Sequence, residues 1–220
     1  MHQFLLSCGL DEDARVKAFQ SYRRYYDLIV AHNESDALMG MISASDFYRK
    51  HVADSLSVLS VWPELLAGSV RLADVGCGAG LPGIILTIAF PDLHLTAIES
   101  NHKKAEFVKM AAAELGLTGR VEVLARRSRE LGHDDRYRNR FDVVTARAVG
   151  KTWKIIRENR LLLARNGSMV LYKTPRTVAA EEPLTRREAD KYKLTIEISE
   201  TITLPAGAGA RQFVRIIAPE

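Results

Sequence analysis

A glycine-rich stretch constrains the fold of this chain more than any other part of its sequence. Residues 72–83 read LADVGCGAGLPG and contain four glycines. A short apolar run over Val70–Val75 precedes the glycines and predicts a β-strand, and Gly83–Phe90 predicts a helix. Glycine permits positive φ and lets a ligand approach the backbone, and the first turn of a helix offers unpaired N–H groups. The stretch therefore predicts a sharp strand-to-helix turn that binds a ligand.

The glycine spacing fits two kinds of cofactor turn. Gly76, Gly78 and Gly80 give G-x-G-x-G, the spacing of a methyl-donor turn. Starting from Gly78 and ending at Gly83, the spacing is instead the G-x-G-x-x-G of nicotinamide-dependent oxidoreductases. Asp74, at the strand end, can hold the turn or orient a cation, and S-adenosylmethionine carries an ammonium and a sulfonium but no pyrophosphate. Asp74 therefore favours the methyl donor, and Gly83 is then a helix residue kept small so that helix and strand pack closely.

A second carboxylate supports a nucleoside ligand. Glu99 follows the next predicted strand, Leu93–Ile98. A carboxylate at that position can accept hydrogen bonds from ribose hydroxyls. Both cofactor classes use such a contact, so Glu99 does not choose between them.

Strands alternate with helices along the rest of the chain. Further strands are expected over Val121–Ala125, Phe141–Ala146, Met169–Tyr172, Leu194–Leu204 and Phe213–Ala218, and helices over Lys103–Leu115, Thr152–Leu163 and Val178–Tyr192. Asn166-Gly167 predicts a turn, and Pro183 predicts a break in the last helix. The alternation predicts an α/β fold with a mostly parallel, doubly wound sheet, which by analogy of fold resembles the Rossmann-like class I methyltransferases. The last two strands are joined by too short a loop for a crossover helix and should form an antiparallel hairpin.

Residues before the glycine stretch read as a helical extension. Amphipathic patterns over residues 11–30 and 45–61 predict two helices, with Asp11 and Ser45 as their caps. We expect residues 1–68 to form an N-terminal helical extension packed on the core, and residues 69–220 to form a core that binds S-adenosylmethionine.

Composition bounds the location and the partners. No apolar run among the 220 residues reaches the roughly 20 that a membrane helix needs, and the N-terminus lacks a basic start. Only Cys8 and Cys77 are present, which fits a reducing compartment, so we expect a cytoplasmic protein without membrane contact. The net charge is +4, and six arginines between Arg126 and Arg140 favour a polyanion such as RNA. We expect no metal site, and nothing requires more than a monomer.

Several segments together resemble one family. DVGCGAGLPGI, HLTAIESNHKKAEFVK and FDVVTARAV, with RKHVADSL upstream, are similar to the glucose-inhibited division protein B family of small-subunit rRNA guanine-N7 methyltransferases. The similarity runs from about Tyr25 to the C-terminal strand. It implies an S-adenosylmethionine-dependent enzyme that methylates N7 of a guanine in 16S rRNA, with 16S rRNA or the 30S subunit as its partner.

The resemblance also implies site residues. In the glycine loop, Gly76 and Leu81 match donor-binding positions. Ser128 and Arg129 match a pair whose backbone lies near the adenine, and Arg147 matches the family arginine after the fourth strand. Lys173 and Arg211 match basic residues on the substrate side, and Arg147 is expected to serve both donor binding and substrate positioning. The chain departs from the family pattern at positions toward that side: Ala37, Met39, Ala146, Thr174 and Gln212.

The chemistry of guanine N7 requires positioning more than a general base. The exposed N7 lone pair can attack a sulfonium methyl in line without first losing a proton. Arg147, Lys173 and Arg211 are therefore expected to bind O6, ribose or phosphate, because N7 itself must face the methyl group. His51 and Asp54 share one helix face at i and i+3, where we favour a structural role, although His51 could also face RNA phosphate.

Three other functions stay open at this point. A methyltransferase of the same fold could act on a small molecule, although the arginine-rich region argues against it. The glycine spacing permits an NAD-dependent oxidoreductase. An RNA-binding protein that has lost catalysis is compatible with the departures from the family pattern.

Overall fold

A mixed β-sheet forms the centre of the protein. The computed structural model describes residues 12–36, 38–40 and 42–220. The strands are β1 (Val70–Val75), β2 (Leu93–Ile98), β3 (Val121–Leu124), β4 (Phe141–Arg147), β5 (Leu163–Lys173), β6 (Thr195–Ile198), β7 (Ile202–Thr203) and β8 (Ala210–Ile217). Their order is β3-β2-β1-β4-β5-β8-β6, with β7 paired to β8. Pairs among β1 to β5 are parallel, whereas β8 runs antiparallel to β5 and β6, so the predicted fold class is confirmed.

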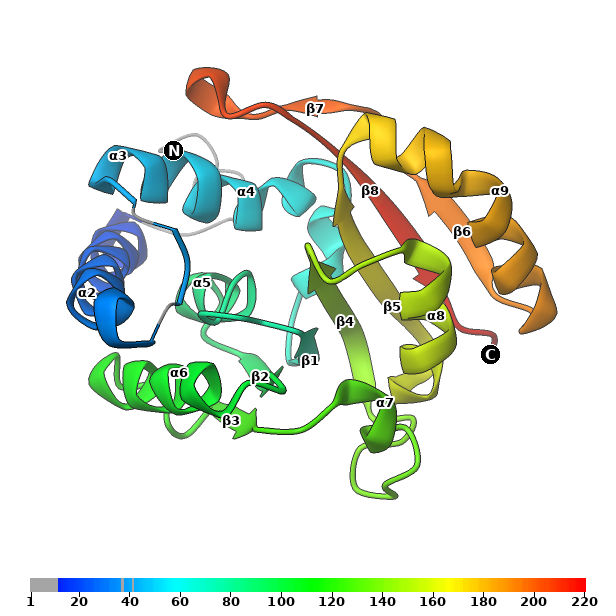
Figure 1. Ribbon diagram of the computed structural model, residues 1–220, viewed down its shortest axis with the longest axis horizontal. Helices are drawn as coiled ribbons and strands as arrows, with labels where there is room; N and C mark the ends of the chain where they lie inside the picture. Colours follow the sequence, from blue (N-terminus) through cyan, green and yellow to red (C-terminus); the bar gives the residue numbers. More distant parts are fainter. Residues whose placement is uncertain (1–11, 37, 41) are drawn as a thin grey trace.

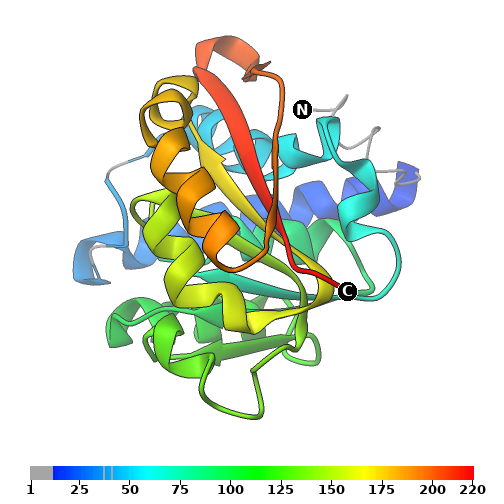
Figure 2. The ribbon, with the colours of Figure 1, turned by 90° about the vertical axis from the view of Figure 1, so that its right-hand side faces the viewer.

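Helices cover both faces of the sheet (Figure 1). One layer holds α2 (Glu12–Asp36), α5 (Gly83–Ala89) and α6 (His102–Glu114). The other holds α7 (Ser128–Leu131), α8 (Thr152–Asn159) and α9 (Pro175–Lys191), and the last two lie side by side in Figure 2. Each layer closes its own cluster of buried apolar side chains against the sheet. In the described part of the chain, no helix is long and apolar enough to cross a membrane.

The strand order reverses beside β1, which locates the ligand crevice. β1 pairs with β2 on one side and with β4 on the other, all three parallel. In such sheets ligands bind outside the carboxyl ends of the strands where the order reverses. The residue pairing of Val75 with Ala146 brings the glycine turn after β1 and Arg147 at the end of β4 to the same edge.

The second N-terminal helix differs from the prediction of one regular helix. It consists of α3 (Ala44–Phe47), a π-helical turn (Tyr48–Val52), α4 (Ala53–Leu56) and a 3₁₀ turn (Ser57–Ser60). Its cap is Ser43, whose hydroxyl accepts the Asp46 N–H, so the prediction of Ser45 was wrong. The first helix runs on to Asp36, and its predicted cap Asp11 lies outside the described residues. Single π-turns are frequent at functional sites, and this one carries His51.

Two local breaker signals are overridden by tertiary structure. α9 continues through Pro183, which is exposed, so its missing N–H does not disturb the packed side of the helix. β5 likewise continues through Asn166-Gly167, where Asn166 has a φ of +57° and the pairing with β4 shifts register. The predicted turn is therefore a bulge within a long strand. The predicted strand Leu194–Leu204 is divided into β6 and β7.

Candidate active site

The turn after β1 has the backbone that its glycines predict. Gly76, Gly78 and Gly80 adopt φ values of +65°, +58° and +90°. Gly83 instead opens α5 with an ordinary helical backbone, and a Cβ there would lie 2.9 Å from a methyl group of Leu95 in β2. The expectation that Gly83 is a small packing residue between helix and strand is confirmed. The space beside the Gly78 Cα is open, which leaves room for a ligand against the turn.

Asp74 lies beneath this turn and is fully buried. Its Oδ2 accepts the Gly83 N–H at 2.8 Å, and its Oδ1 accepts the Thr145 hydroxyl at 3.0 Å. Burial raises the pKa of Asp74 to about 6, although the hydrogen bonds from Gly83 and Thr145 act in the opposite direction. Of the two roles expected for Asp74, these contacts are those of a residue that holds the turn. A direct contact with a donor cation stays a prediction.

Glu99 connects the glycine turn to the start of α6. Its Oε2 accepts the Gly78 N–H and its Oε1 accepts the Asn101 N–H, both at 2.9 Å. The side chain is partly exposed. Each carboxylate oxygen has a second lone pair, so these contacts leave acceptors for ribose hydroxyls.

A pocket of about 290 Å³ lies at the carboxyl ends of β1 and β2. It brings together Gly76, Ser128 and Arg129, three of the residues expected to bind the donor. Val149, from the loop after β4, also lines it, and a Cβ at Gly76 would lie 2.9 Å from a Val149 methyl group. Leu81 is buried within the turn and does not line this pocket.

The N-terminal helix supports the same turn. The hydroxyl of Tyr25 donates to the Ala79 carbonyl, and that of Tyr22 donates to the Ile85 carbonyl at 3.2 Å. Both rings are fully buried. The sequence places Tyr22 on the apolar side of the predicted helix, but nothing in that pattern indicates that Tyr25 reaches a backbone carbonyl 54 residues away.

Asp54 holds two of the predicted substrate-side arginines. Arg211 donates to it twice, from Nε at 2.5 Å and from Nη2 at 2.6 Å. Arg147 donates from Nη1 at 3.1 Å, and its Nη2 is 3.2 Å from Nδ1 of His51. Asp54 is fully buried, whereas the side chains of Arg147 and Arg211 are 12% and 22% exposed. The two guanidinium groups thus stand at the rim of the site, fixed from below by one carboxylate.

This cluster has surplus positive charge. A guanidinium can only donate, so Nδ1 of His51 must accept, which requires a neutral ring. Burial first, and then the charge of Arg147, lower the pKa of His51 to about 4. Two positive charges therefore face the single negative charge of Asp54. The expectation that Asp54 fixes the helix against the core agrees with its bonds to β4 and β8.

Lys173 is held separately, by α9. Its Nζ donates to the Gly150 carbonyl at 2.5 Å and lies 3.2 Å from Oε2 of Glu181. Glu181 also accepts the N–H and the hydroxyl of Thr152. Lys173 is buried. It therefore fixes the loop between β4 and α8, and a substrate contact of its own stays a prediction.

Residues that depart from the family pattern have partners of their own. Thr174 caps α9 through the Thr177 N–H at 3.3 Å, and Gln212 donates to the Ser199 carbonyl at 2.9 Å. Ala146 is buried in β4, and Met39 packs against the core. Ala37 lies outside the described residues.

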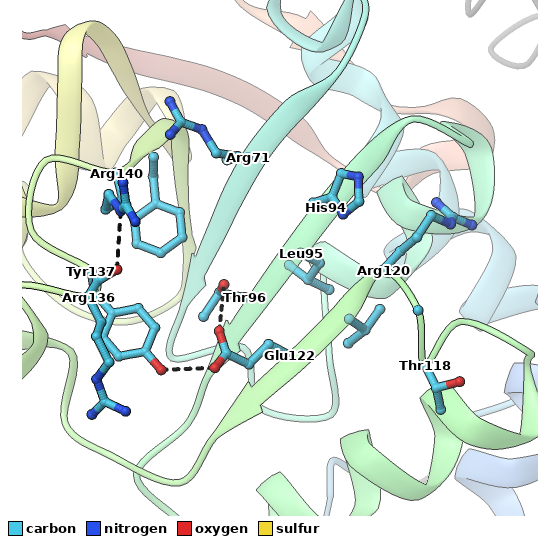
Figure 3. Close-up of a pocket in the computed structure, with 13 residues that line it drawn as sticks. Arg71, His94, Leu95, Thr96, Thr118, Arg120, Glu122, Arg136, Tyr137 and Arg140 are labelled. Atoms are coloured by element: carbon cyan, nitrogen blue, oxygen red, sulfur yellow. Dashed lines mark hydrogen bonds between the residues drawn. The ribbon is translucent and has the colours of Figure 1, made fainter.

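A second pocket, of about 460 Å³, opens at the amino ends of β1, β2 and β3 (Figure 3). Its charged side chains are engaged within the protein: Arg71 pairs with Asp142, and Arg120 donates to backbone carbonyls. Glu122 accepts from Thr96 and Tyr137 (Figure 3). This pocket lies at the end of the sheet opposite to the glycine turn, so it is not the cofactor crevice.

We expect His51→Gln to change how stability depends on pH. The folded-state pKa of His51 is about 4 against an ordinary 6.5, so the unfolded chain takes up this proton first as pH falls, and His51 costs stability between pH 6.5 and 4. The pKa of Asp74 is raised from 3.8 to about 6, so Asp74 has the opposite effect on the pH dependence of stability: the folded state takes up its proton first as pH falls. Urea unfolding should therefore show the variant gaining stability relative to wild type between pH 7.5 and pH 5. If the difference in unfolding free energy between variant and wild type does not change with pH, the pKa of His51 is the same in the folded and unfolded states.

Known proteins resemble the chain in sequence and in fold. The pattern of the rRNA small subunit methyltransferase G (GidB) family matches residues 18–205. A ribosomal RNA small subunit methyltransferase G from Sorangium cellulosum is 38% identical over 92% of this chain and 82% of its own length. The protein of the same name from Solibacter usitatus is 36% identical over 89% of both chains. A SAM-dependent O-methyltransferase from Thermotoga maritima shares the fold with a TM-score of 0.55, 13% identity, and coverage of 83% of this chain and 68% of that one.

These matches agree with the geometry of the site. The residues matched by the family pattern span the glycine turn, Asp54 and Arg147, and the relatives are matched over most of their length. The chain therefore belongs to the rRNA small subunit methyltransferase G family and is an S-adenosylmethionine-dependent methyltransferase.

Proposed function

We propose that the protein transfers the methyl group of S-adenosylmethionine to N7 of a guanine in 16S rRNA. The observation that carries this proposal is the arginine pair on Asp54 at the strand edge that also bears the glycine turn. A donor held by the turn would thus lie beside a surface with surplus positive charge. Such a surface suits a nucleotide with phosphate and carbonyl acceptors better than an apolar small molecule.

The donor side of the proposal rests on the turn and the pocket. The open space beside Gly78, the free lone pairs of Glu99, and the pocket lined by Ser128 and Arg129 fit a nucleoside with an amino-acid tail. When bound, S-adenosylmethionine supplies an electrophilic methyl group. The residues of the chain orient it: Glu99 for the ribose, the backbone of Ser128 and Arg129 for the adenine, and the glycine turn for the tail.

The substrate side needs no strong base. N7 attacks through a lone pair that is already free, and no proton has to leave first. His51, with a pKa of about 4, is a weak base and its Nδ1 is engaged by Arg147. We therefore assign Arg147 and Arg211 to positioning, through O6, ribose or phosphate of the target nucleotide.

The test is a methyl-transfer assay with three forms of substrate: protein-free 16S rRNA, 30S subunits and mature ribosomes. Transfer of label from S-adenosylmethionine to rRNA, followed by digestion and mass spectrometry, should give N7-methylguanosine. Calorimetry should show binding of S-adenosylhomocysteine and not of NAD. Methylated adenosine or cytidine, or transfer only to small molecules, would contradict the proposal.

A cytoplasmic location and a monomeric state belong to the same proposal. An enzyme that modifies rRNA during or after subunit assembly works where the ribosomes are. The residues assigned to the donor and to the target nucleotide all come from one copy of the chain, so a second copy is not needed to complete the site.

We expect Arg211→Lys to reduce turnover without weakening donor binding. Lysine keeps the charge but cannot make the two parallel hydrogen bonds that Arg211 makes to Asp54. Because Arg211 is assigned to the RNA side, kcat on rRNA should fall about tenfold or more, while the Kd for S-adenosylhomocysteine stays within about threefold. If donor affinity falls as far as kcat does, Arg211 acts on the donor side and the assignment is wrong.

A further inference from the structure

A hollow of about 570 Å³ lies between α8 and α9 on the outer face of the molecule. Trp153 of α8 lines one side, and Leu184, Arg187, Glu188 and Lys191 of α9 line the other. These α9 positions recur every three or four residues, so they share one side of the helix. We call this hollow the α8–α9 groove; the two helices that form it lie side by side in Figure 2.

Two aromatic rings lie under cations: Trp153, which lines the α8–α9 groove, and Tyr192, which follows the groove residue Lys191 in the chain. The guanidinium of Arg157 lies 5.0 Å from the ring centre of Trp153. Tyr192 carries two cations, with Arg160 at 3.8 Å and Lys191 at 5.1 Å from its ring centre. Alternating aromatic and cationic side chains are the usual surface for single-stranded nucleic acid, because bases stack on the rings and phosphates meet the cations.

The cations of the groove are not neutralised by carboxylates. Neighbouring residues form ion pairs, as Lys154 does with Glu158 and Arg186 does with Glu182. Four cations at the groove have no carboxylate oxygen within 4.0 Å among residues 12–36, 38–40 and 42–220: Arg157, Arg160, Arg187 and Lys191. Glu188 is the carboxylate that lines the groove, so these four cations leave a net positive charge for an anionic partner.

Two polar atoms at the groove have no hydrogen-bond partner among the described residues, and one apolar side chain is exposed. Within the described part of the chain, Nε1 of Trp153 and Oε1 of Glu188 are buried and have no hydrogen-bond partner. Leu184 is 50% exposed beside them and offers apolar contact.

A basic track connects the groove to the donor pocket. Arg127 and Arg129 line that pocket, together with the ion pair of Lys154 and Glu158. A shallow depression between α7 and α8 follows, where three arginines (Arg129, Arg157 and Arg160) outnumber two carboxylates (Glu130 and Glu158). Arg157 lies over the ring of Trp153, which lines the groove, so a surface on which cations outnumber carboxylates leads from the donor pocket to α9.

We propose that the α8–α9 groove binds a single-stranded segment of the substrate RNA, with its phosphates on the four cations and one unpaired base against Trp153. This inference rests on the proposed function, since it assigns to the RNA flanking the target guanine a path over α8. An RNA strand that reaches the groove while its target nucleotide lies beside Arg147 is bound at two places. The two contacts fix the direction of the strand across the enzyme.

The test compares charge reversals at the groove with a reversal elsewhere. Arg157→Glu and Lys191→Glu should each weaken binding to protein-free 16S rRNA about tenfold, and each should lower the slope of log affinity against log salt by about one. Lys109→Glu is the matched control, because Lys109 is exposed on α6, which covers the opposite face of the sheet. It should bind within about twofold of wild type at moderate salt, and all three variants should bind S-adenosylhomocysteine as wild type does.

Trp153→Leu separates stacking from charge. It keeps an apolar side chain in α8 and removes the ring, so RNA affinity should fall about tenfold with an unchanged salt slope. If this variant does not fold, the two charge reversals, which change exposed side chains, still decide the question.

The possible outcomes test the inference about the groove and the proposed function separately. Groove variants that bind 16S rRNA as tightly as wild type would overturn the inference, whether or not wild type methylates rRNA. If the wild-type protein binds rRNA through the groove but methylates no guanine N7, only the proposed function is contradicted. Variants that lose affinity for 30S subunits but not for protein-free rRNA would show that the groove contacts a ribosomal protein, which also contradicts the inference.

Discussion

Asp54→Asn is expected to lower the free energy of unfolding by about 3–5 kcal/mol and to abolish most methyl transfer. Asp54 is fully buried, and both of its oxygens accept from guanidinium groups. An asparagine keeps the shape, but it removes the negative charge and turns an NH₂ toward donors. The charges of Arg147 and Arg211 would then lie next to each other without compensation, and breaking a buried ion pair from one side is costly for that reason.

Urea unfolding at pH 7.5 measures the loss, and Asp46→Asn is the control. Asp46 lies in α3 and pairs with Arg49 and Lys50 at the surface, where water screens the charges, so its replacement should change stability little. Adding Arg211→Met to Asp54→Asn removes one of the uncompensated charges and should recover part of the loss. A cost below about 1 kcal/mol for Asp54→Asn would mean that the arginines find other partners and that Asp54 does not position them.

The sequence predicted the central sheet well because its signals are local and strong. Except at Arg71 and His94, β1 and β2 are buried, so each reads as a short and mostly apolar run, and both were predicted with their observed bounds. Asp74 and Glu99 were found because parallel strands end at a common edge, where carboxylates have a recognisable position. What those carboxylates bond to was not readable, since the partners are backbone N–H groups whose placement depends on the turn.

The rest of the site depends on contacts between distant parts of the chain. Asp54 and Arg211 are 157 residues apart, and no periodicity links them. The resemblance to the family named both residues but not the bond between them. The π-turn that carries His51 also escaped prediction, because a π-turn differs from an α-helix by a single hydrogen-bond step that apolar periodicity does not record.

Gly80→Ala is expected to cost about 3 kcal/mol of stability and to weaken binding of S-adenosylhomocysteine at least tenfold. At Gly80 the backbone φ is +90°, which L side chains rarely adopt. A Cβ there would also lie 2.7 Å from the Tyr25 hydroxyl and 2.8 Å from Cγ1 of Ile84. The hydroxyl holds the Ala79 carbonyl, so moving it displaces the turn that is proposed to bind the donor.

Gly78→Ala separates backbone strain from crowding. Its φ is +58° and nothing lies within 4 Å of the added Cβ, so the cost should be about 1 kcal/mol, from backbone strain alone. Urea unfolding and calorimetry with S-adenosylhomocysteine would be run on both variants. Equal losses of stability would show that Tyr25 does not support the turn. A large loss of donor affinity in Gly78→Ala, with stability nearly unchanged, would instead show that the donor occupies the open space beside Gly78. The contact of α2 with Gly80 would then serve to hold the turn that borders this space.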